Sequence, residues 1–372
     1  MKKKIFFITT CRADYGYIEE LLNEASKSLN NFSIYLIISG NHFSTFFGNS
    51  HKLIKKFKNI TKIKIYIPYL NKEITSTIKT INHASEKFGK LLKKKKPDLV
   101  VTFGDRFEMF AFSLATYTHN IKQAHIAGGE ITKGSLDDGY RHCMTKFSNY
   151  HFPVTDKYKK HLIKMGENPK TIFNVGNLGL DKIKKINFLS KNELNKKLGI
   201  NLLNYNFLVV FHPETSEIYK TNENFQNLIS AISEFKNINF IFTSPGEDFL
   251  SKKFVYTIRK FAKRKKNIYF YKNLGSKIYL SLLKNSNGII GNSSSGISEA
   301  PMLNIPTLNI GNRQKGRISM NSIYNCSSKK NEIIRNIRKI LKKKNYKNLN
   351  LYGNGNAAKK IVMQINEFNL SL

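Results

Sequence analysis

Short apolar runs alternate with amphipathic stretches along almost the whole chain, and this alternation constrains the fold more than any other feature. Apolar residues at helical spacing fill the gaps between the runs. Strands that alternate with helices form parallel sheets that helices cover on both faces. The sequence therefore predicts α/β architecture. Runs of strand length occur at residues 5–10, 33–39, 62–67, 99–103, 123–127, 150–154, 207–211, 240–243, 268–271, 288–291 and 307–310.

The length of the chain predicts more than one domain. Its 372 residues are too many for one ordinary hydrophobic core. A polar stretch rich in lysine and asparagine, at 176–199, is the expected join, and the last stretch has the spacing of an amphipathic helix. We predict one domain over 1–180, a second over 181–355 and a terminal helical segment over 356–372.

The strongly basic composition raises nucleic-acid binding as a function. Lysine and arginine number 62 against 25 acidic residues, which gives a net charge of +37. However, the basic runs lie at expected helix ends, where cations are favourable. No aromatic-interleaved RNA motif, zinc finger or basic tail accompanies them. We interpret the charge as lysine on solvent faces that also attracts anionic ligands, and expect no nucleic-acid partner. Binding that vanishes with modest added salt would be incidental.

Hydropathy and cysteine content indicate the compartment. No apolar run approaches the length needed to cross a bilayer, so no membrane insertion is expected. Cys11, Cys143 and Cys326 are widely spaced and form no metal-ligand or disulfide pattern. A cytoplasmic location is the prediction.

Loops that follow the expected strands are the first place to look for function, because ligands bind at the carboxyl ends of strands in open α/β sheets. Arg12, Asp14 and Gly16 follow the first strand. The loop lacks G-x-G-x-x-G, so NAD is not expected. Arg12 can grip a phosphate with two N–H groups. The structural alternative is an ion pair between Arg12 and Asp14.

Acidic residues gather after two later strands of the first half. Asp105 and Arg106 follow the run at 99–103, and Glu130 follows paired glycines after the run at 123–127. Asp137 and Arg141 begin the next helix. Burial of Glu130 would raise its pKa toward the range of a general acid. Several carboxylates in one site suit acid–base chemistry, although Asp105 can simply pair with Arg106 and Asp137 can simply cap its helix.

The second half carries an anion-binding pattern. A Gly/Ser turn leads from the strand at 288–291 toward a helix, whose backbone N–H groups and serine hydroxyls suit a phosphate. His212, at a strand end, can donate to a leaving phosphate, and Ser244 begins a loop suited to a base or ribose. Glu299 can accept from ribose hydroxyls, and Arg313 can close on the same anion. The predicted binding residues of this half are Ser244, Ser293, Ser294, Ser295, Gly296, Glu299 and Arg313.

Taken in order, these motifs resemble the hydrolysing UDP-N-acetylglucosamine 2-epimerases of bacterial sialic- and legionaminic-acid pathways. No single motif is decisive, but their shared order is highly specific. The motifs that carry the resemblance are Arg12–Gly16, Gly104–Glu108, His125–Glu130, Asp137-Asp138 with Arg141-His142, Asn174–Gly176, Leu178–Asp181, Asn292–Gly296, Gly311–Arg317 and Tyr352–Gly355.

The resemblance implies a GT-B-like fold, in which two Rossmann-like domains with parallel sheets flank a central cleft and the terminal helix returns to the first domain. It implies a homodimer or homotetramer that needs neither NAD nor a metal. The implied reaction expels a nucleotide diphosphate from C1 with loss of the C2 proton, and water then adds to the glycal. The free sugar is inverted at C2, as in N-acetylmannosamine, for cell-surface polysaccharides.

Roles follow from that reaction by residue type. Asp105, Glu130 and Asp137 would move the protons, with no assignment of which does which, and Arg141 lies among them. Arg12, Arg106, Arg313, His212 and Ser293–Ser295 would neutralise the diphosphate. Many relatives carry Glu or His where this chain has Ala127. The alanine side chain offers no proton or hydrogen bond, so the acid–base role shifts toward Glu130 and Asp105. The alanine is also consistent with a sugar substrate that differs from that of those relatives.

Two other enzymes remain open at this point. A GT-B glycosyltransferase would leave C2 untouched and need an acceptor, whereas a non-hydrolysing 2-epimerase would return a nucleotide-linked product. The sequence does not decide whether the substrate carries N-acetylglucosamine or a 2,4-diacetamido-trideoxy sugar. It also does not decide whether the nucleotide is UDP or GDP.

Overall fold

The computed structural model describes residues 2–45, 49–67, 74–214, 218–245, 250–343, 346, 348, 351–368 and 370. Pro68, expected to end the third strand, and Gly246, expected in the Ser244 loop, lie outside these residues. By internal contacts the chain forms two compact units. The first contains Met1–Glu130, Asp137–Lys184 and Leu351–Leu372, and the second contains Ile131–Leu136 and Lys185–Asn350.

The first unit is built on a parallel six-stranded sheet with the order β3-β2-β1-β4-β5-β6. The order reverses between β1 and β4, which creates the crevice where ligands bind in such sheets. Its strands are β1 (Lys3–Thr9), β2 (Phe32–Ile38), β3 (Ile60–Lys64), β4 (Leu99–Phe103), β5 (Lys122–Ile126) and β6 (Tyr150–Phe152). Its helices are α1 (Arg12–Ser28), α2 (Ile74–Lys95), α3 (Phe107–Thr118), α4 (Asp137–Phe147), α5 (Asp156–Lys164), α6 (Leu178–Lys185) and α14 (Ala357–Glu367).

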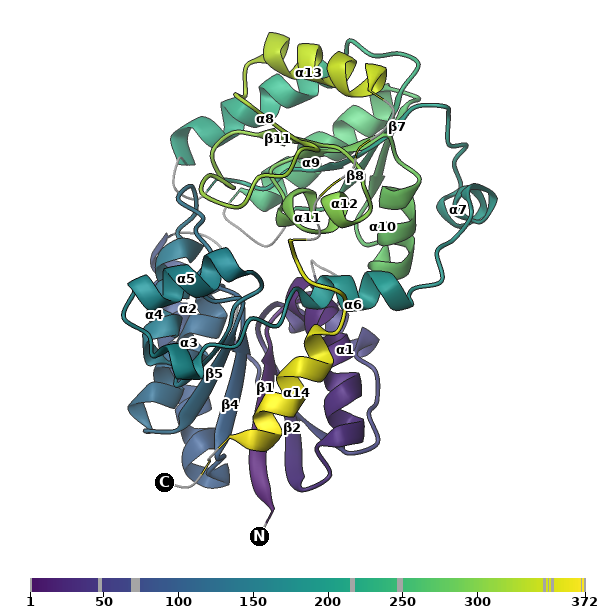
Figure 1. Ribbon diagram of the computed structural model, residues 1–372. Helices are drawn as coiled ribbons and strands as arrows, with labels where there is room; N and C mark the ends of the chain where they lie inside the picture. The colour runs from purple at the N-terminus through teal and green to yellow at the C-terminus, as the bar shows by residue number, and fades with distance from the viewer. Residues whose placement is uncertain are drawn as a thin grey trace. The chain divides into compact units, whose positions relative to one another are not determined.

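Helices cover both faces of this sheet, as its uninterrupted apolar strands require. Figure 1 shows α1 and α14 on one face and α2, α3 and α4 on the other. Along β1, Ile5 and Phe7 belong to the core under α1 and α14, whereas Phe6 and Ile8 belong to the core under α2 and α3. The two-residue period of a strand therefore serves two hydrophobic layers at once.

The second unit repeats the design with the strand order β12-β11-β10-β7-β8-β9, again parallel, and its reversal lies between β10 and β7. The sequence missed β12, an edge strand of four residues with exposed Asn325 and half-buried Tyr324. Its strands are β7 (Asn206–Val210), β8 (Asn239–Thr243), β9 (Ile268–Tyr271), β10 (Gly288–Gly291), β11 (Thr307–Ile310) and β12 (Ile323–Cys326). Its helices are α7 (Lys191–Leu198), α8 (Ile218–Ile232), α9 (Ser251–Arg264), α10 (Gly275–Lys284), α11 (Ser294–Ile297), α12 (Glu299–Met302) and α13 (Lys330–Lys342).

The C-terminal helix α14 belongs to the first unit because one buried carboxylate holds its start. Asp181 accepts hydrogen bonds from the backbone N–H groups of Ala357, at 3.0 Å, and Ala358, at 2.7 Å. Ile361 and Ile365 of α14 are buried in the same core as Leu21 of α1. The first unit therefore contains Asp181, which a boundary at 180/181 assigns to the second domain.

A short segment from the first half of the sequence, Ile131–Leu136, packs in the second unit. The backbone N–H of Lys133 donates to the carbonyl of Lys315, at 3.0 Å. Gly134 lies directly against the backbone of Asn312, so any side chain at 134 would collide with it. This segment separates two predicted site residues, Glu130 and Asp137, in the sequence.

None of the helices within the described ranges combines the length and the apolar character needed to cross a bilayer.

We predict that Asp181→Ala destabilises α14 by about 2 kcal/mol, because two helix N–H groups lose a charged acceptor in a buried position. Hydrogen exchange of the Ile361 and Ile365 amides measures this directly. Asp156→Ala is the matched control, since Asp156 accepts a hydrogen bond from Asn174 on the surface. Its effect should stay within about 0.5 kcal/mol. Equal protection of α14 in both variants would contradict this account of how the helix is held.

Candidate active site

The loop after β1 is organised by Asp14, whose carboxylate is buried. It accepts hydrogen bonds from the backbone N–H of Thr10, at 2.8 Å, the hydroxyl of Thr10, at 2.8 Å, and the N–H of Cys11, at 3.1 Å. The hydroxyl of Thr9 also donates to it. Asp14 therefore shapes the turn into α1, while Arg12, the first residue of that helix, is exposed.

A buried histidine continues this network. Nε2 of His42 lies 2.8 Å from the hydroxyl of Thr9, and Nδ1 lies 2.9 Å from the hydroxyl of Ser50. Burial lowers the pKa of His42 to about 4, although Asp14 opposes the shift. The ring is therefore neutral at physiological pH and links the ends of β1 and β2 through hydroxyl groups.

Two carboxylates of the first unit meet at Arg141, which is 1% exposed. Its guanidinium pairs with the carboxylate of Asp105, from the loop after β4, and with Asp138, at 3.1 Å, from its own helix α4. It also donates to the backbone carbonyl of Glu130, at 3.0 Å, after β5. One buried cation thus joins three chain segments: it holds the carboxylate of Asp105 and the backbone of Glu130 beside its own helix.

Arg106 has an acidic partner that the sequence motifs did not predict. Its Nε and Nη2 donate to the two carboxylate oxygens of Glu108, at 3.0 and 3.1 Å. Glu108 is fully buried, whereas the Arg106 side chain is 23% exposed. The expected pairing of Asp105 with Arg106 is therefore replaced by two pairs, Asp105 with Arg141 and Glu108 with Arg106. Glu108 lies in the first turn of α3, two residues after Arg106, and this short spacing was the one signal of the contact in the sequence.

His125, at the end of β5, positions the loops around Arg141. Its Nε2 donates to the carbonyl of Gly104, at 2.8 Å, and its Nδ1 lies 3.2 Å from the hydroxyl of Thr145 on α4. A carbonyl only accepts, so Nε2 carries the proton. Burial lowers the pKa of His125 to about 4. A neutral imidazole thus links the loop after β4 to α4.

The turn after β5 has an unusual backbone at Ala127. Its φ angle is +65°, in the left-handed region that side chains other than glycine seldom adopt. Gly129 follows with φ +78°, and a side chain there would collide with Tyr158 and Leu162 of α5. The turn delivers Glu130, which is 7% exposed, to the end of the sheet. Asp137, seven residues on, is half-buried in the first turn of α4.

In the second unit, Asn292 organises the loop after β10. Its amide accepts from the backbone N–H of His212, at 2.7 Å, and donates to the carbonyl of His212, at 2.9 Å. The carbonyl of Asn292 accepts from Arg313, at 3.1 Å, and from Gln314, at 2.9 Å. The loops that contain His212, Asn292 and Arg313 are therefore fixed against one another. Asn292 was not among the predicted site residues, since its role is to hold backbone.

The helix that follows the serine turn is shorter than expected. Ser293 caps α11 by accepting from the N–H of Ser295, at 3.3 Å, and the Ser295 hydroxyl accepts from Tyr279, at 2.8 Å. The helix predicted to start here is two four-residue helices joined at Ser298. Pro301 has no N–H to donate to the carbonyl of Ile297, four residues earlier, and the helix is interrupted at Ser298, before the proline. A phosphate seat at this turn therefore depends on the turn itself more than on a helix dipole.

The remaining predicted residues take separate positions in the second unit. Ser244 is buried at the end of β8, Ser294 begins α11, and Glu299 begins α12 and is half-buried. The hydroxyl of Thr307 donates to the carbonyl of Gly296, at 2.6 Å. Gly16 lies within α1 of the first unit.

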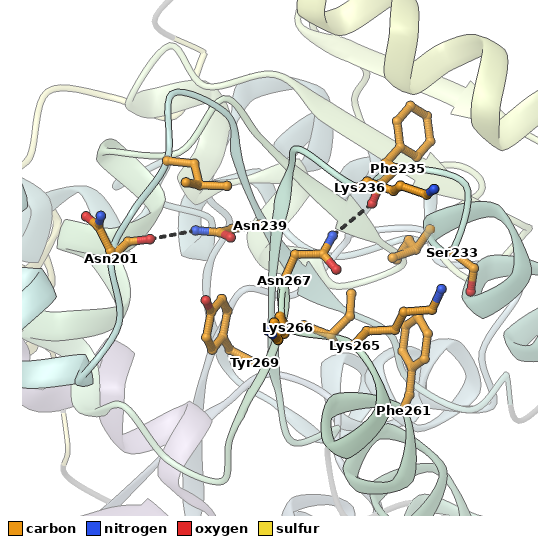
Figure 2. Close-up of a pocket in the computed structure, with 13 residues that line it drawn as sticks. Asn201, Ser233, Phe235, Lys236, Asn239, Phe261, Lys265, Lys266, Asn267 and Tyr269 are labelled. Carbon is orange, nitrogen blue, oxygen red and sulfur yellow. Dashed lines mark hydrogen bonds between the residues drawn. The ribbon is translucent and has the colours of Figure 1, made fainter.

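A pocket of about 330 Å³ in the second unit lies away from all these residues. Figure 2 shows its lining side chains, which include Lys236, Asn267 and Tyr269. Asn239 and Ile268, which open β8 and β9, also line it, so it lies at the amino ends of the strands. The loops that contain Arg12, Asp105 and His212 follow the carboxyl ends of strands, at the other edge of their sheets.

Two parallel six-stranded sheets, each with polar residues at its carboxyl edge, define a GT-B-like α/β protein. The model of the family described as UDP-N-acetylglucosamine 2-epimerase matches residues 24–366, and the chain belongs to that family. Polysialic acid biosynthesis protein P7 of Escherichia coli is 37% identical over 341 residues, which cover 90% of this chain and 85% of that protein.

Two further curated relatives are named for a hydrolysing reaction. The GDP/UDP-N,N'-diacetylbacillosamine 2-epimerase (hydrolyzing) of Campylobacter jejuni is 36% identical, covering 87% of this chain and 84% of its own length. The UDP-N,N'-diacetylbacillosamine 2-epimerase (hydrolyzing) of Legionella pneumophila is 31% identical, covering 97% and 94%.

Solved structures confirm the predicted fold. UDP-GlcNAc 2-epimerase from Neisseria meningitidis, bound to UDP-GlcNAc, superposes with a TM-score of 0.82 at 18% identity, covering 98% of this chain and 100% of that one. TcCGT1 in complex with UDP gives a TM-score of 0.61 at 12% identity, covering 99% and 100%. At these identities the likeness concerns the fold alone.

Acid should destabilise the first unit because it buries three neutral histidines. Burial lowers the pKa of His42, His125 and His151 to about 4 each. Below their unfolded pKa near 6.5, the unfolded chain binds more protons than the native one, so stability falls as the pH drops toward 4. From pH 7 to pH 5 each histidine should cost about 2 kcal/mol.

Urea unfolding of wild type and His125→Gln at both pH values measures how much His125 contributes to the fall in the free energy of unfolding. Glutamine can still donate to Gly104 but cannot be protonated, so the variant should lose about 2 kcal/mol less between the two pH values. His83→Gln, on α2, keeps all three buried rings and should follow the wild type. An unchanged pH dependence in His125→Gln would show that the pKa of the His125 ring is the same in the native and unfolded states.

Proposed function

We propose that the protein is a hydrolysing 2-epimerase of a UDP-linked N-acetylhexosamine, either UDP-N-acetylglucosamine or a 2,4-diacetamido-trideoxy relative. It releases UDP and the free sugar inverted at C2. Two relatives that are at least 31% identical and nearly equal in length carry hydrolysing 2-epimerase names. The observation that carries the proposal is that the buried Arg141 fixes the Asp105 carboxylate beside the backbone of Glu130, because C2 inversion needs acidic groups for proton transfer on carbon.

The reaction has two stages. In the first, a base removes the C2 proton while the C1–O bond breaks and its electron pair leaves with the diphosphate, which yields a glycal. In the second, water adds its oxygen to C1 and a proton is delivered to C2 from the opposite face. No carbonyl acidifies the C2 proton, so proton removal and departure of the leaving group must assist each other.

The first unit supplies the proton-transfer groups. Glu130 and Asp105 have carboxylates at the ends of adjacent strands, and Asp137 lies in the first turn of α4. Arg141 acts as a positioning residue, since it fixes the Asp105 carboxylate and the backbone of Glu130. General acid–base catalysis by groups of this kind is worth about 10²–10⁴ in rate.

The second unit supplies groups for the diphosphate. Arg313, the serine turn of Ser293–Ser295 and His212 are mutually fixed through Asn292 and its neighbours. Preorganised donors stabilise the charge that builds on a leaving group, by about 3–4 kcal/mol each.

Two rival activities share the fold. A glycosyltransferase would transfer the sugar to an acceptor and leave C2 unchanged, and a non-hydrolysing epimerase would return a UDP-linked epimer. The acids around Arg141 support the first-stage elimination over simple transfer. The hydrolysing names of the more similar relatives support a free sugar as product.

Turnover in D₂O tests the reaction. With UDP-N-acetylglucosamine or its 2,4-diacetamido relative, we expect UDP and a free 2-epimer that carries deuterium at C2, read by proton NMR. A UDP-linked epimer would identify a non-hydrolysing enzyme. UDP release without deuterium at C2 would reject the elimination.

Glu130→Gln should lower kcat by about 10²–10⁴-fold with little change in KM, because the amide keeps the shape but moves no proton. UDP release measured against time gives both constants. Glu86→Gln, on the exposed face of α2, is the matched control and should retain full activity. A variant at 130 that keeps more than a tenth of wild-type kcat would remove Glu130 from the acid–base role.

A further inference from the structure

Asn41 buries a carboxamide that has no partner. The residue is 4% exposed, and both its Oδ1 and its Nδ2 are buried without a hydrogen bond in the described structure. Buried polar groups are almost always bonded, and each one left alone is costly to the fold. An acceptor and a donor on one side chain, both unpaired, therefore indicate a group supplied from outside the chain.

The position of Asn41 is tied to the proposed active site. It lies in the short 3-10 helix Gly40–Phe43 that directly follows β2, at the carboxyl edge of the first sheet. The N–H of Ser39 donates to the carbonyl of Thr9, at 3.0 Å. Gly40, with φ +56°, packs so closely on the carbonyl of Thr10 that a side chain would meet it at 2.7 Å. Asn41 is therefore fixed beside the loop that leads to Arg12.

The chemistry of a carboxamide limits what can pair with it. It offers one carbonyl acceptor and an NH₂ donor side by side. Another amide matches both at once, with its N–H on the carbonyl and its C=O on the NH₂. A sugar hydroxyl or a phosphate oxygen satisfies only part of this set. The best complement on a nucleotide-sugar is an acylamino substituent.

Strand order indicates which acylamino group this is. Asp105 follows β4 and Glu130 follows β5, whereas Asn41 follows β2, with β1 between β2 and β4. Neighbouring strands lie about 4.8 Å apart, so Asn41 is about two strand spacings from the nearer acid. The reacting C1 and C2 must lie at the acids. In a pyranose ring C4 lies opposite C1, so the C4 substituent is the one that extends toward β2.

We propose that Asn41 recognises the 4-acylamino group of a 2,4-diacylamino hexose and thereby selects that sugar class over one with a 4-hydroxyl. The inference rests on the proposed function for the identity of the reacting carbons. A purely structural asparagine would behave differently, because it would be hydrogen-bonded in the free protein and its loss would destabilise the fold.

The test compares wild type, Asn41→Leu and the control Asn23→Leu on UDP-2,4-diacetamido-2,4,6-trideoxyglucose and UDP-N-acetylglucosamine. Leucine matches asparagine in size and removes both polar groups. Wild type should prefer the diacylamino substrate, and Asn41→Leu should reduce that preference in kcat/KM by about 10- to 100-fold, mainly through KM. Asn41→Leu should melt no lower than wild type. The control Asn23→Leu, on α1, should leave both activities unchanged.

Calorimetric titration with the same two nucleotide-sugars separates this inference from the proposed reaction. If no epimer forms from either compound, the proposed function fails, while a loss of affinity confined to the diacylamino compound in Asn41→Leu would still support the recognition. Equal losses on both compounds, a wild-type preference for UDP-N-acetylglucosamine, or a marked fall in melting temperature in Asn41→Leu would each overturn the inference.

Discussion

The contacts of the buried Arg141 join the loops at the carboxyl edge of the first sheet. One guanidinium pairs with Asp105 and Asp138 and holds the backbone of Glu130, so the loop after β4, the turn after β5 and helix α4 share one centre. Removing one partner of a buried charge pair leaves the other charge uncompensated. The arrangement is therefore cooperative, and His125 and Gly104 reinforce it through a neutral hydrogen bond.

In the second unit an uncharged residue, Asn292, joins the loops. Asn292 is fully buried, and its side-chain amide holds both backbone groups of His212. Its backbone carbonyl accepts hydrogen bonds from the side chains of Arg313 and Gln314. This division suits the proposed chemistry, since a leaving diphosphate needs fixed donors while the sugar carbon needs groups that exchange protons.

Much of the architecture follows from pattern alone, because alternating strand and helix periods leave few parallel α/β solutions. The strand positions were predicted except for β12, which is short and half exposed. The positions of the residues that follow the strands could also be predicted, because the carboxyl ends of parallel strands lie at one edge of the sheet. The hydrogen-bond and ion-pair partners of these residues could not be predicted from the sequence. The contacts of Asp181 with the start of α14 and of Asn292 with His212 are set by packing between distant segments. The pairing of Arg106 with Glu108 is local, and side-chain geometry decides it. The interruption at Ser298 that divides the predicted helix became clear only from the backbone geometry.

Whether these acids act on the sugar carbon can be measured through the oxygen that water contributes. Turnover in H₂¹⁸O, followed by mass spectrometry of both products, reports which bond breaks. The account predicts one ¹⁸O in the released sugar and none in UDP, since water adds to C1 after the C1–O bond has broken. Label in the UDP would mean that water attacks phosphorus, and the role given to the acids around Arg141 would then be wrong.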